Sequence, residues 1–91
     1  MNLNIIDKIH GCIIDLEMSG SKRRDIVITT SYIVKKFIED EASYISGSRV
    51  SDLVTIHGVK ISFEHFTNDI VIYDKHKACL NGEYIKILKF N

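Results

Sequence analysis

The sequence predicts an α+β fold, with two helices packed on a small, mostly antiparallel sheet in the order α-β-α-β-β-β-β-β. The first observation is a β-branched segment, Ile26-Val27-Ile28, that runs directly into an amphipathic segment over residues 31–46. The second is that the residues after Gly47 form short apolar runs separated by turn residues, which is typical of strands. The third is the chain length of 91 residues, which suits a single α+β domain over residues 1–91.

A first helix is expected at the N-terminus, capped by Asn2 or Asn4 and ended by Gly20. The inner stripe that would dock on the sheet consists of Ile6, Ile9, Ile13 and Leu16. Four further apolar side chains project at other angles: Leu3, Ile5, Cys12 and Ile14. We expect these four to form an exposed patch that a second copy or a larger partner covers. The alternative is a helix buried on several sides within one chain.

The second helix is expected over residues 31–46. The run Thr29-Thr30-Ser31 offers hydroxyl groups to cap its first amides, and Gly47 suits a left-handed end. A single broad apolar face is predicted, with Phe37 in its middle, and it consists of Ile33, Val34, Phe37, Ile38, Ala42 and Ile45. The acidic run 39–41 is interpreted as solvated surface, with a docking patch as the alternative.

The second half of the chain is expected to be β-structure. Strands are predicted over residues 53–57, 59–64, 70–73, 77–80 and 83–87. Gly58 predicts a tight bend or a bulge between the first two of these strands. Asn81-Gly82 predicts a two-residue type I′ hairpin between the last two, because both residues accept positive φ.

The charge balance bears on the class of partner. Twelve basic and twelve acidic residues give a formal net charge of zero, so the chain has no general attraction to nucleic acid or to acidic membranes. Low net charge also removes a barrier to self-association. No apolar run is long enough to span a membrane, and the N-terminus does not have the pattern of a signal peptide. Two cysteines are too few for a disulfide framework, so we expect reduced thiols in the cytoplasm.

A local exception to this balance is the basic loop Lys22-Arg23-Arg24. Three adjacent cations can hold a phosphate group or an acidic protein surface. The alternative interpretation is a solvated connector, since a nucleic-acid groove usually adds aromatic residues or a longer basic stripe.

No catalytic or metal-binding constellation is evident in the sequence. The four histidines lack the spacing of a zinc helix, and neither Cys12 nor Cys79 has a neighbour that would activate its thiol. Two interpretations stay open for His57 and His65, which are either a facing pair across a hairpin or two ordinary surface residues. We therefore expect no enzyme activity, no metal and no cofactor.

Residues 25–87 resemble a segment of tailed-phage shell (capsid) proteins of the HK97 type. The likeness begins with the strand Ile26-Val27-Ile28-Thr29 and its helix, and continues through Thr55-Ile56-His57-Gly58-Val59-Lys60-Ile61 and Asn68-Asp69-Ile70-Val71-Ile72-Tyr73-Asp74 to a closing hairpin. The chain has Val59-Lys60 where that family usually has proline, and it has no extended arm or long spine helix. The resemblance implies an assembly role and brings no catalytic residues.

These observations lead to one functional expectation and one alternative. We expect a small non-enzymatic interaction or assembly protein, encoded by a phage or mobile element. It would form homo-oligomers or dock on a larger protein, in the host cytoplasm or in a virion assembled there, without membrane or nucleic acid as partner. The alternative is a nucleic-acid-associated regulator that uses the basic loop at residues 22–24.

Overall fold

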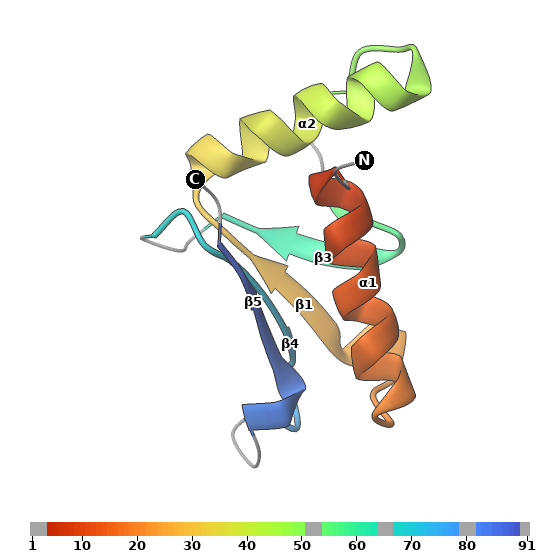
Figure 1. The fold of residues 1–91 in the computed structure, drawn as a ribbon, viewed down its shortest axis with the longest axis vertical. Helices are drawn as coiled ribbons and strands as arrows, with labels where there is room; N and C mark the ends of the chain where they lie inside the picture. The colour runs from red at the N-terminus through yellow and green to blue at the C-terminus, as the bar shows by residue number, and fades with distance from the viewer. Residues whose placement is uncertain (1–3, 51–53, 64–66, 79–81, 90–91) are drawn as a thin grey trace.

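A computed structural model describes residues 4–50, 54–63, 67–78 and 82–89 of the chain (Figure 1). Its elements are the helices α1 (Ile5–Met18) and α2 (Tyr32–Ser46) and the strands β1 (Ile26–Thr29), β2 (Thr55–Ile56), β3 (Val59–Ser62), β4 (Ile70–Asp74) and β5 (Ile85–Leu88). Short 3-10 helices, Arg23–Asp25 and Gly82–Tyr84, precede β1 and β5. The predicted α+β class is confirmed, and the helices and strands follow the predicted order, with four described strands after α2 where five were predicted.

The five strands form one sheet in the order β2-β3-β1-β4-β5. The central strand β1 runs parallel to β3 and antiparallel to β4, whereas β2 with β3 and β4 with β5 are antiparallel pairs. A parallel pair needs a crossover connection, and α2 lies in the connection between β1 and β3. The sheet is therefore mostly antiparallel, as predicted.

One face of the sheet carries the core. The strand residues whose side chains alternate onto this face are buried, and α1 lies across them (Figure 1). Helix α1 contributes Ile9, Ile13 and Leu16, which recur at the spacing of one helix face and are fully buried. The core cluster consists of Ile9, Ile13, Leu16, Ile26, Ile28, Val34, Ile38, Ile56, Val59, Ile61, Ile70 and Ile72.

The predicted caps of both helices are present. Asn4 Oδ1 accepts a hydrogen bond from the Asp7 amide at 2.7 Å, and Ser31 Oγ accepts one from the Val34 amide at 3.3 Å. Gly47 ends α2 in the left-handed conformation at φ 73°. These boundaries depend on side chains next to the backbone groups they cap, so the local sequence predicted them.

The prediction of a single buried face on α2 is wrong. This helix lies across the end of the sheet, over the N-terminus of α1 (Figure 1), and its fully buried residues are Val34 and Ile38. Phe37, expected in the middle of the face, is 52% exposed, and Ile33 and Ile45 are also exposed. A helix that crosses the end of a sheet contacts it over a narrow strip, so much of its apolar stripe stays at the surface.

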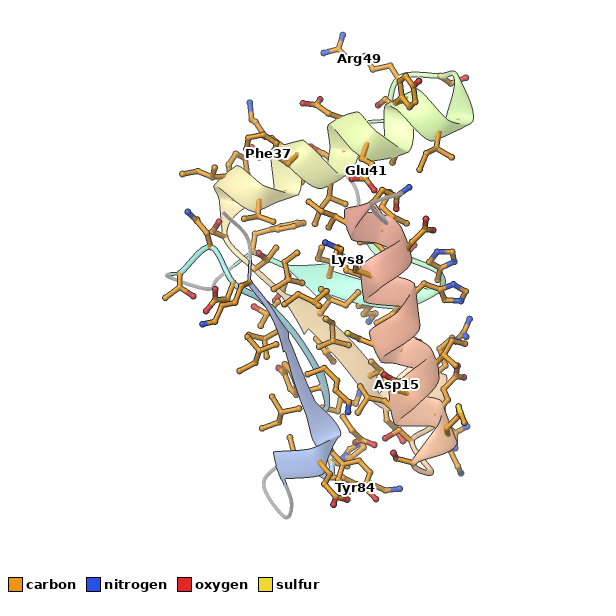
Figure 2. The ribbon with its side chains drawn as sticks, viewed as in Figure 1. Lys8, Asp15, Phe37, Glu41, Arg49 and Tyr84 are labelled. Carbon is orange, nitrogen blue, oxygen red and sulfur yellow. The ribbon has the colours of Figure 1, made fainter. Side chains whose placement is uncertain are left out.

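Glu41 joins the two helices. Its carboxylate accepts hydrogen bonds from the amides of Ile5 at 3.1 Å and Ile6 at 2.9 Å (Figure 2). The first amides of a helix have no partner within the helix, and its positive end favours a negative group. Glu41 therefore holds the start of α1 against α2, a structural contact that differs from the solvated surface predicted for residues 39–41.

The type I′ turn geometry predicted for Asn81-Gly82 appears instead at His57-Gly58, between β2 and β3. These two residues have φ values of 50° and 80°, and positive φ at both positions is what such a turn requires. Asn81 lies outside the described residues, and Gly82 begins a 3-10 helix. Tyr73 pairs with Ile85, so β4 and β5 are joined by residues 75–84 and not by a two-residue turn. The predicted hairpin is wrong.

Asp74 explains where the chain turns after β4. Its Oδ1 accepts hydrogen bonds from the amides of His76 at 2.8 Å and Lys77 at 3.1 Å, while its backbone carbonyl accepts from the Lys77 and Ala78 amides. Lys77 and Ala78, placed in a predicted strand over 77–80, thus form a turn, and residues 79–80 lie outside the described part. An aspartate that accepts from the next amides competes with continuation of a strand.

Candidate functional site

The second face of the sheet has no helix against it among the described residues (Figure 1). The strand register places Val27 between Lys60 of β3 and Tyr73 of β4, and places Ile85 of β5 beside Tyr73. We call this surface the open face, which consists of Val27, Thr29, Lys60, Ser62, Val71, Tyr73, Ile85 and Ile87. Its β4–β5 half is apolar, and a large uncovered apolar patch is a candidate interaction surface.

Within the part of the chain that the structure describes, strand β5 forms a free edge of the sheet beside this apolar half. Ile85 and Ile87 point to the open face and are 37% and 56% exposed. Lys86 and Leu88 point to the face that α1 covers, as does Ile72, the residue paired with Lys86. Edge strands are usually protected by charges, proline or bulges, and β5 has one such charge, Lys86 on the face that α1 covers, while its open face presents two isoleucines. The sequence does not reveal this edge, because the order of strands in a sheet is a tertiary property.

Of the apolar patch predicted on α1, two side chains are partly buried and one is exposed. Leu3 lies outside the described residues. Ile5 and Cys12 are half-buried and pack against the core, whereas Ile14 is 37% exposed. Burial, and after it the charge of Asp15, raises the pKa of the Cys12 thiol, which disfavours the reactive thiolate. Exposed apolar surface lies mainly on α2 and β5, at positions such as Ile33 and Ile87.

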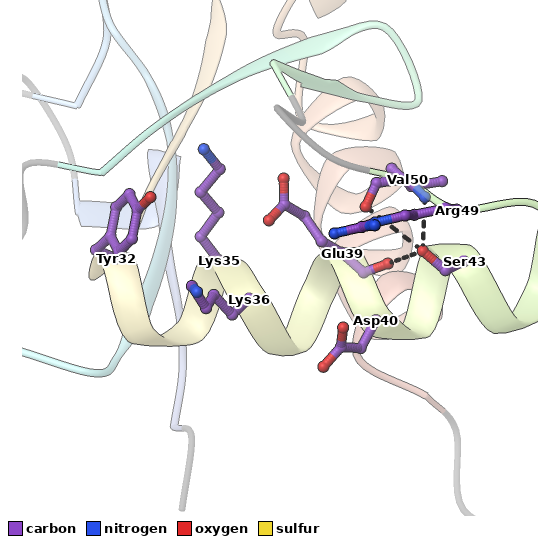
Figure 3. Close-up of a pocket in the computed structure, with 8 residues that line it drawn as sticks. All are labelled: Tyr32, Lys35, Lys36, Glu39, Asp40, Ser43, Arg49 and Val50. Atoms are coloured by element: carbon purple, nitrogen blue, oxygen red, sulfur yellow. Dashed lines mark hydrogen bonds between the residues drawn. The ribbon is translucent and has the colours of Figure 1, made fainter.

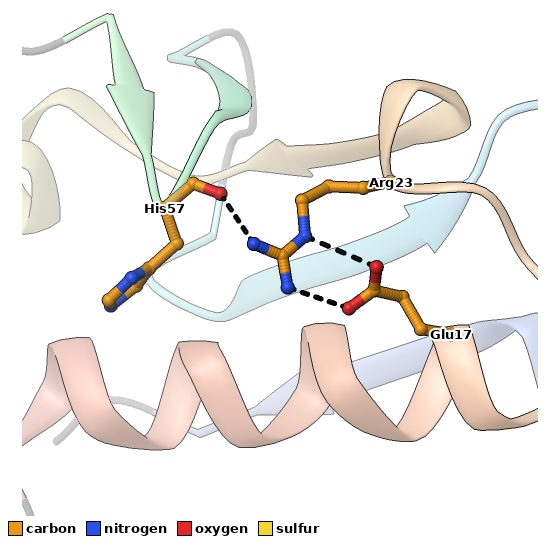
Figure 4. Close-up of polar contacts among 3 residues, drawn as sticks. All are labelled: Glu17, Arg23 and His57. Carbon is orange, nitrogen blue, oxygen red and sulfur yellow. Dashed lines mark hydrogen bonds and ion pairs between the residues drawn. The ribbon is translucent and has the colours of Figure 1, made fainter.

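The three cations of the basic loop differ in their contacts. Arg23 donates to both carboxylate oxygens of Glu17 at 2.7 and 3.3 Å, and to the carbonyl of His57 at 3.3 Å (Figure 4). Arg23 thus joins the end of α1 to the β2–β3 turn, and its hydrogen bonds with Glu17 raise its pKa further. Lys22 and Arg24 are exposed. The three predicted cations therefore have different roles, since Arg23 is held in place and the other two face solvent.

His57 has a ring partner on α1 that was not predicted from the sequence. Its ring stacks on His10 of α1 with ring centroids 4.0 Å apart and an angle of 15° between the planes. His65 lies outside the described residues, so the proposed pair remains a prediction. Burial, the charge of His10 and the charge of Arg23 lower the pKa of His57, which favours the neutral ring. Within the described ranges no group of three or more His, Cys, Asp or Glu side chains could hold a metal ion.

A polar groove of about 450 Å³ runs along α2 (Figure 3). It is closed at one end by Ser43, whose hydroxyl accepts from the Val50 amide at 2.7 Å and donates to the Glu39 carbonyl at 2.8 Å. The charged residues that line it are of both signs, and they are Lys35, Lys36, Glu39, Asp40 and Arg49. Mixed charges in an open groove offer no preference for an anion or a cation, so we assign no chemistry to this surface.

The described helices include none that is long and apolar enough to cross a membrane. No protein-family model matches the chain, and no curated protein matches it. The surface with the clearest structural rationale is thus the free edge of β5 together with the apolar half of the open face.

Proposed function

We propose that this protein is a non-enzymatic assembly module whose copies associate through the free edge of β5. The observation that carries the proposal is a four-residue edge strand on which Ile85 and Ile87 are exposed. An exposed strand edge presents unpaired backbone amides and carbonyls that another strand can join. The resemblance of residues 25–87 to HK97-type shell proteins supports an assembly role, and with it a phage or mobile-element origin and a place in the host cytoplasm or virion.

A second copy of this chain is the partner that fits best. The net charge of zero gives two copies no overall repulsion. Two β5 strands that pair antiparallel around a two-fold axis present the same surface to each other, as closed symmetric dimers require. Their sheets would join into one continuous sheet, with both α1 helices on the same side.

Charge selects the register of this pairing. An axis centred on Lys86 would place two lysines directly opposite each other, which is destabilising. An axis centred on Ile87 places Ile87 opposite its symmetry copy and Lys86 opposite Leu88, while keeping every pair on a common face. Four residues bury less area than a standard protein interface, so we expect reversible association that weakens on dilution.

The molar mass of the protein at several concentrations tests the proposal. We expect a monomer–dimer equilibrium, and we expect Ile87→Lys to leave the chain folded and monomeric. Ile33→Lys is the matched control, because Ile33 is equally apolar and exposed but lies on α2. A wild-type chain that stays monomeric at millimolar concentration, or two variants with equal effects, would contradict the proposal.

Cross-linking tests the register separately. Under oxidising conditions Ile87→Cys should form an intermolecular disulfide between two copies of residue 87, identified by peptide mapping. Ile85→Cys, on the same strand and face, is the control and should not link to itself, because its opposite position is residue 89. Efficient linkage through residue 85 alone would show that the register is wrong.

A further inference from the structure

Cations from three separate segments line one pocket beside the β2–β3 turn. Arg23 and Arg24 precede β1, Lys60 lies on β3, and Lys75 follows β4. The pocket measures about 230 Å³, and its remaining lining residues are Ile26, Val27 and Gly58. None of the lining residues is acidic, in a chain whose net charge is zero. Folding therefore brings together positive charges that lie between residues 23 and 75 of the sequence.

The strand pairing explains why these cations meet. Lys60 is the register partner of Val27, so it lies beside the start of β1. The Lys75 amide donates to the Asp25 carbonyl at 2.9 Å, which places Lys75 next to the segment that contains Arg24. Arg23 reaches the same place because it bonds to the carbonyl of His57.

The charges in the pocket are incompletely neutralised. Glu17 pairs with Arg23, but within the described part of the chain Arg24, Lys60 and Lys75 form no ion pair or side-chain hydrogen bond. The carboxylate of Asp25, beside Arg24 in sequence, contacts His76 Nε2 at 3.5 Å. Neighbouring like charges without counter-ions repel each other, and a cleft concentrates their field, so a bound anion would stabilise this arrangement.

We propose that this pocket binds a phosphate group. A phosphate accepts hydrogen bonds on several oxygens and carries up to two negative charges, which suits three unpaired cations better than a single carboxylate does. Arg23 uses three of its five N–H groups on Glu17 and His57, and so keeps two for a ligand. The volume is smaller than the roughly 300–1,000 Å³ of sites that enclose a whole organic ligand. The phosphate would lie in the pocket, with the rest of its carrier on Val27 and Tyr73 of the open face.

Titration of the full chain by two-dimensional amide NMR tests this site. The probes are inorganic phosphate, a 5′-mononucleotide and a 5′-phosphorylated single-stranded oligonucleotide, each against chloride at equal ionic strength. We expect saturable shifts at Gly58, Lys60 and Lys75. Lys60→Ala and Lys75→Ala should each weaken binding about tenfold, because each removes a hydrogen bond between charged groups.

Lys22→Ala is the matched control, since Lys22 belongs to the same basic loop but does not line the pocket. It should change affinity less than about twofold if the pocket is specific. Binding of all three probes would indicate a site for a single phosphate group, and binding of the oligonucleotide alone through Lys60 and Lys75 would indicate backbone phosphates. No shift with any probe, or equal losses for Lys22→Ala and Lys60→Ala, would overturn the proposal.

Discussion

The two edges of the sheet differ in a way that strand length does not predict. The two-residue strand β2 is held by contacts outside the sheet, because Ile56 is buried, the His57 ring stacks on α1 and Arg23 bonds to the His57 carbonyl. The four-residue strand β5 pairs with β4 on one side and leaves Ile87 exposed on its open face. The shorter edge is thus fastened to the helix layer through its turn, whereas the longer edge packs Leu88 against the core and leaves its open-face isoleucines exposed.

The largest expected effect compares these two edges directly. Ile56→Ala should lower the free energy of unfolding by about 2–5 kcal/mol, because it removes a side chain that is only 5% exposed from the core. Ile87→Ala should cost less than about 1 kcal/mol at concentrations where the chain is monomeric. Urea denaturation of both variants checks this, and equal losses would show that the two edges are anchored alike.

Asp74 begins the connection to β5, and its charge should make that end of the sheet sensitive to acid. Burial raises the pKa of this carboxyl, but hydrogen bonds from Ser21 and from the amides of His76 and Lys77, together with the Lys77 charge, outweigh burial and hold the pKa below its ordinary 3.8. Among the described residues, buried Ser21 Oγ and Asp74 Oδ2 have no hydrogen-bond partner of good geometry, so the two amides are the firmer contacts.

A folded-state pKa below the unfolded value means that Asp74 stabilises the fold above about pH 4, and that this contribution is lost as the pH falls through the folded-state pKa. Asp74→Asn should therefore cost about 1.5–3 kcal/mol at pH 7 and flatten the loss of stability below pH 4. Unfolding midpoints measured from pH 7 to pH 2 check this. Parallel curves for the two chains would show that Asp74 is not the acid-sensitive group.

Valine substitutions at Gly58 and Gly82 should have smaller effects on stability, and they compare the two predicted turn positions. Gly58→Val should cost about 1–3 kcal/mol, since residue 58 has φ 80° and a β-branched side chain resists that conformation. Gly82→Val should cost less, because Gly82 begins a 3-10 helix and a Cβ added there meets no atom within 4 Å. Thermal unfolding of both variants ranks them. A larger loss at residue 82 would restore the hairpin predicted from Asn81-Gly82.

The smallest expected effect concerns the contact that fastens β2 to α1. Arg23→Ala removes an ion pair between partly exposed side chains, so the global free energy of unfolding should change little. Amide hydrogen exchange at Gly58 and Val59 should nevertheless become faster, because the turn loses its link to α1. Unchanged exchange at these amides would mean that stacking of His57 on His10 is sufficient to hold this edge.

The candidate surfaces were predictable only in part. The sequence predicted a basic loop that includes Arg23 and Arg24. Nothing in the sequence marks Lys60 or Lys75 as part of the same site, because strand pairing brings them beside the loop. Ile5 and Cys12 were expected in an exposed patch on α1 but pack against the core, which agrees with the alternative of a helix buried on several sides. Ile87 reads as an ordinary strand residue until the sheet order places β5 at an edge.

The sequence by itself determined the elements whose causes are local. The caps at Asn4, Ser31 and Gly47 depend on neighbouring backbone groups, and the alternation in β3 and β4 depends on the pleat of a strand. Tertiary structure alone decided how much of each apolar stripe is covered, which left Phe37 exposed and packed Cys12 against the core. It also decided that Glu41 caps α1 and that four cations from three separate segments share one pocket. A periodic sequence pattern predicts which way a side chain points. What surrounds that side chain depends on the segments that folding brings next to it.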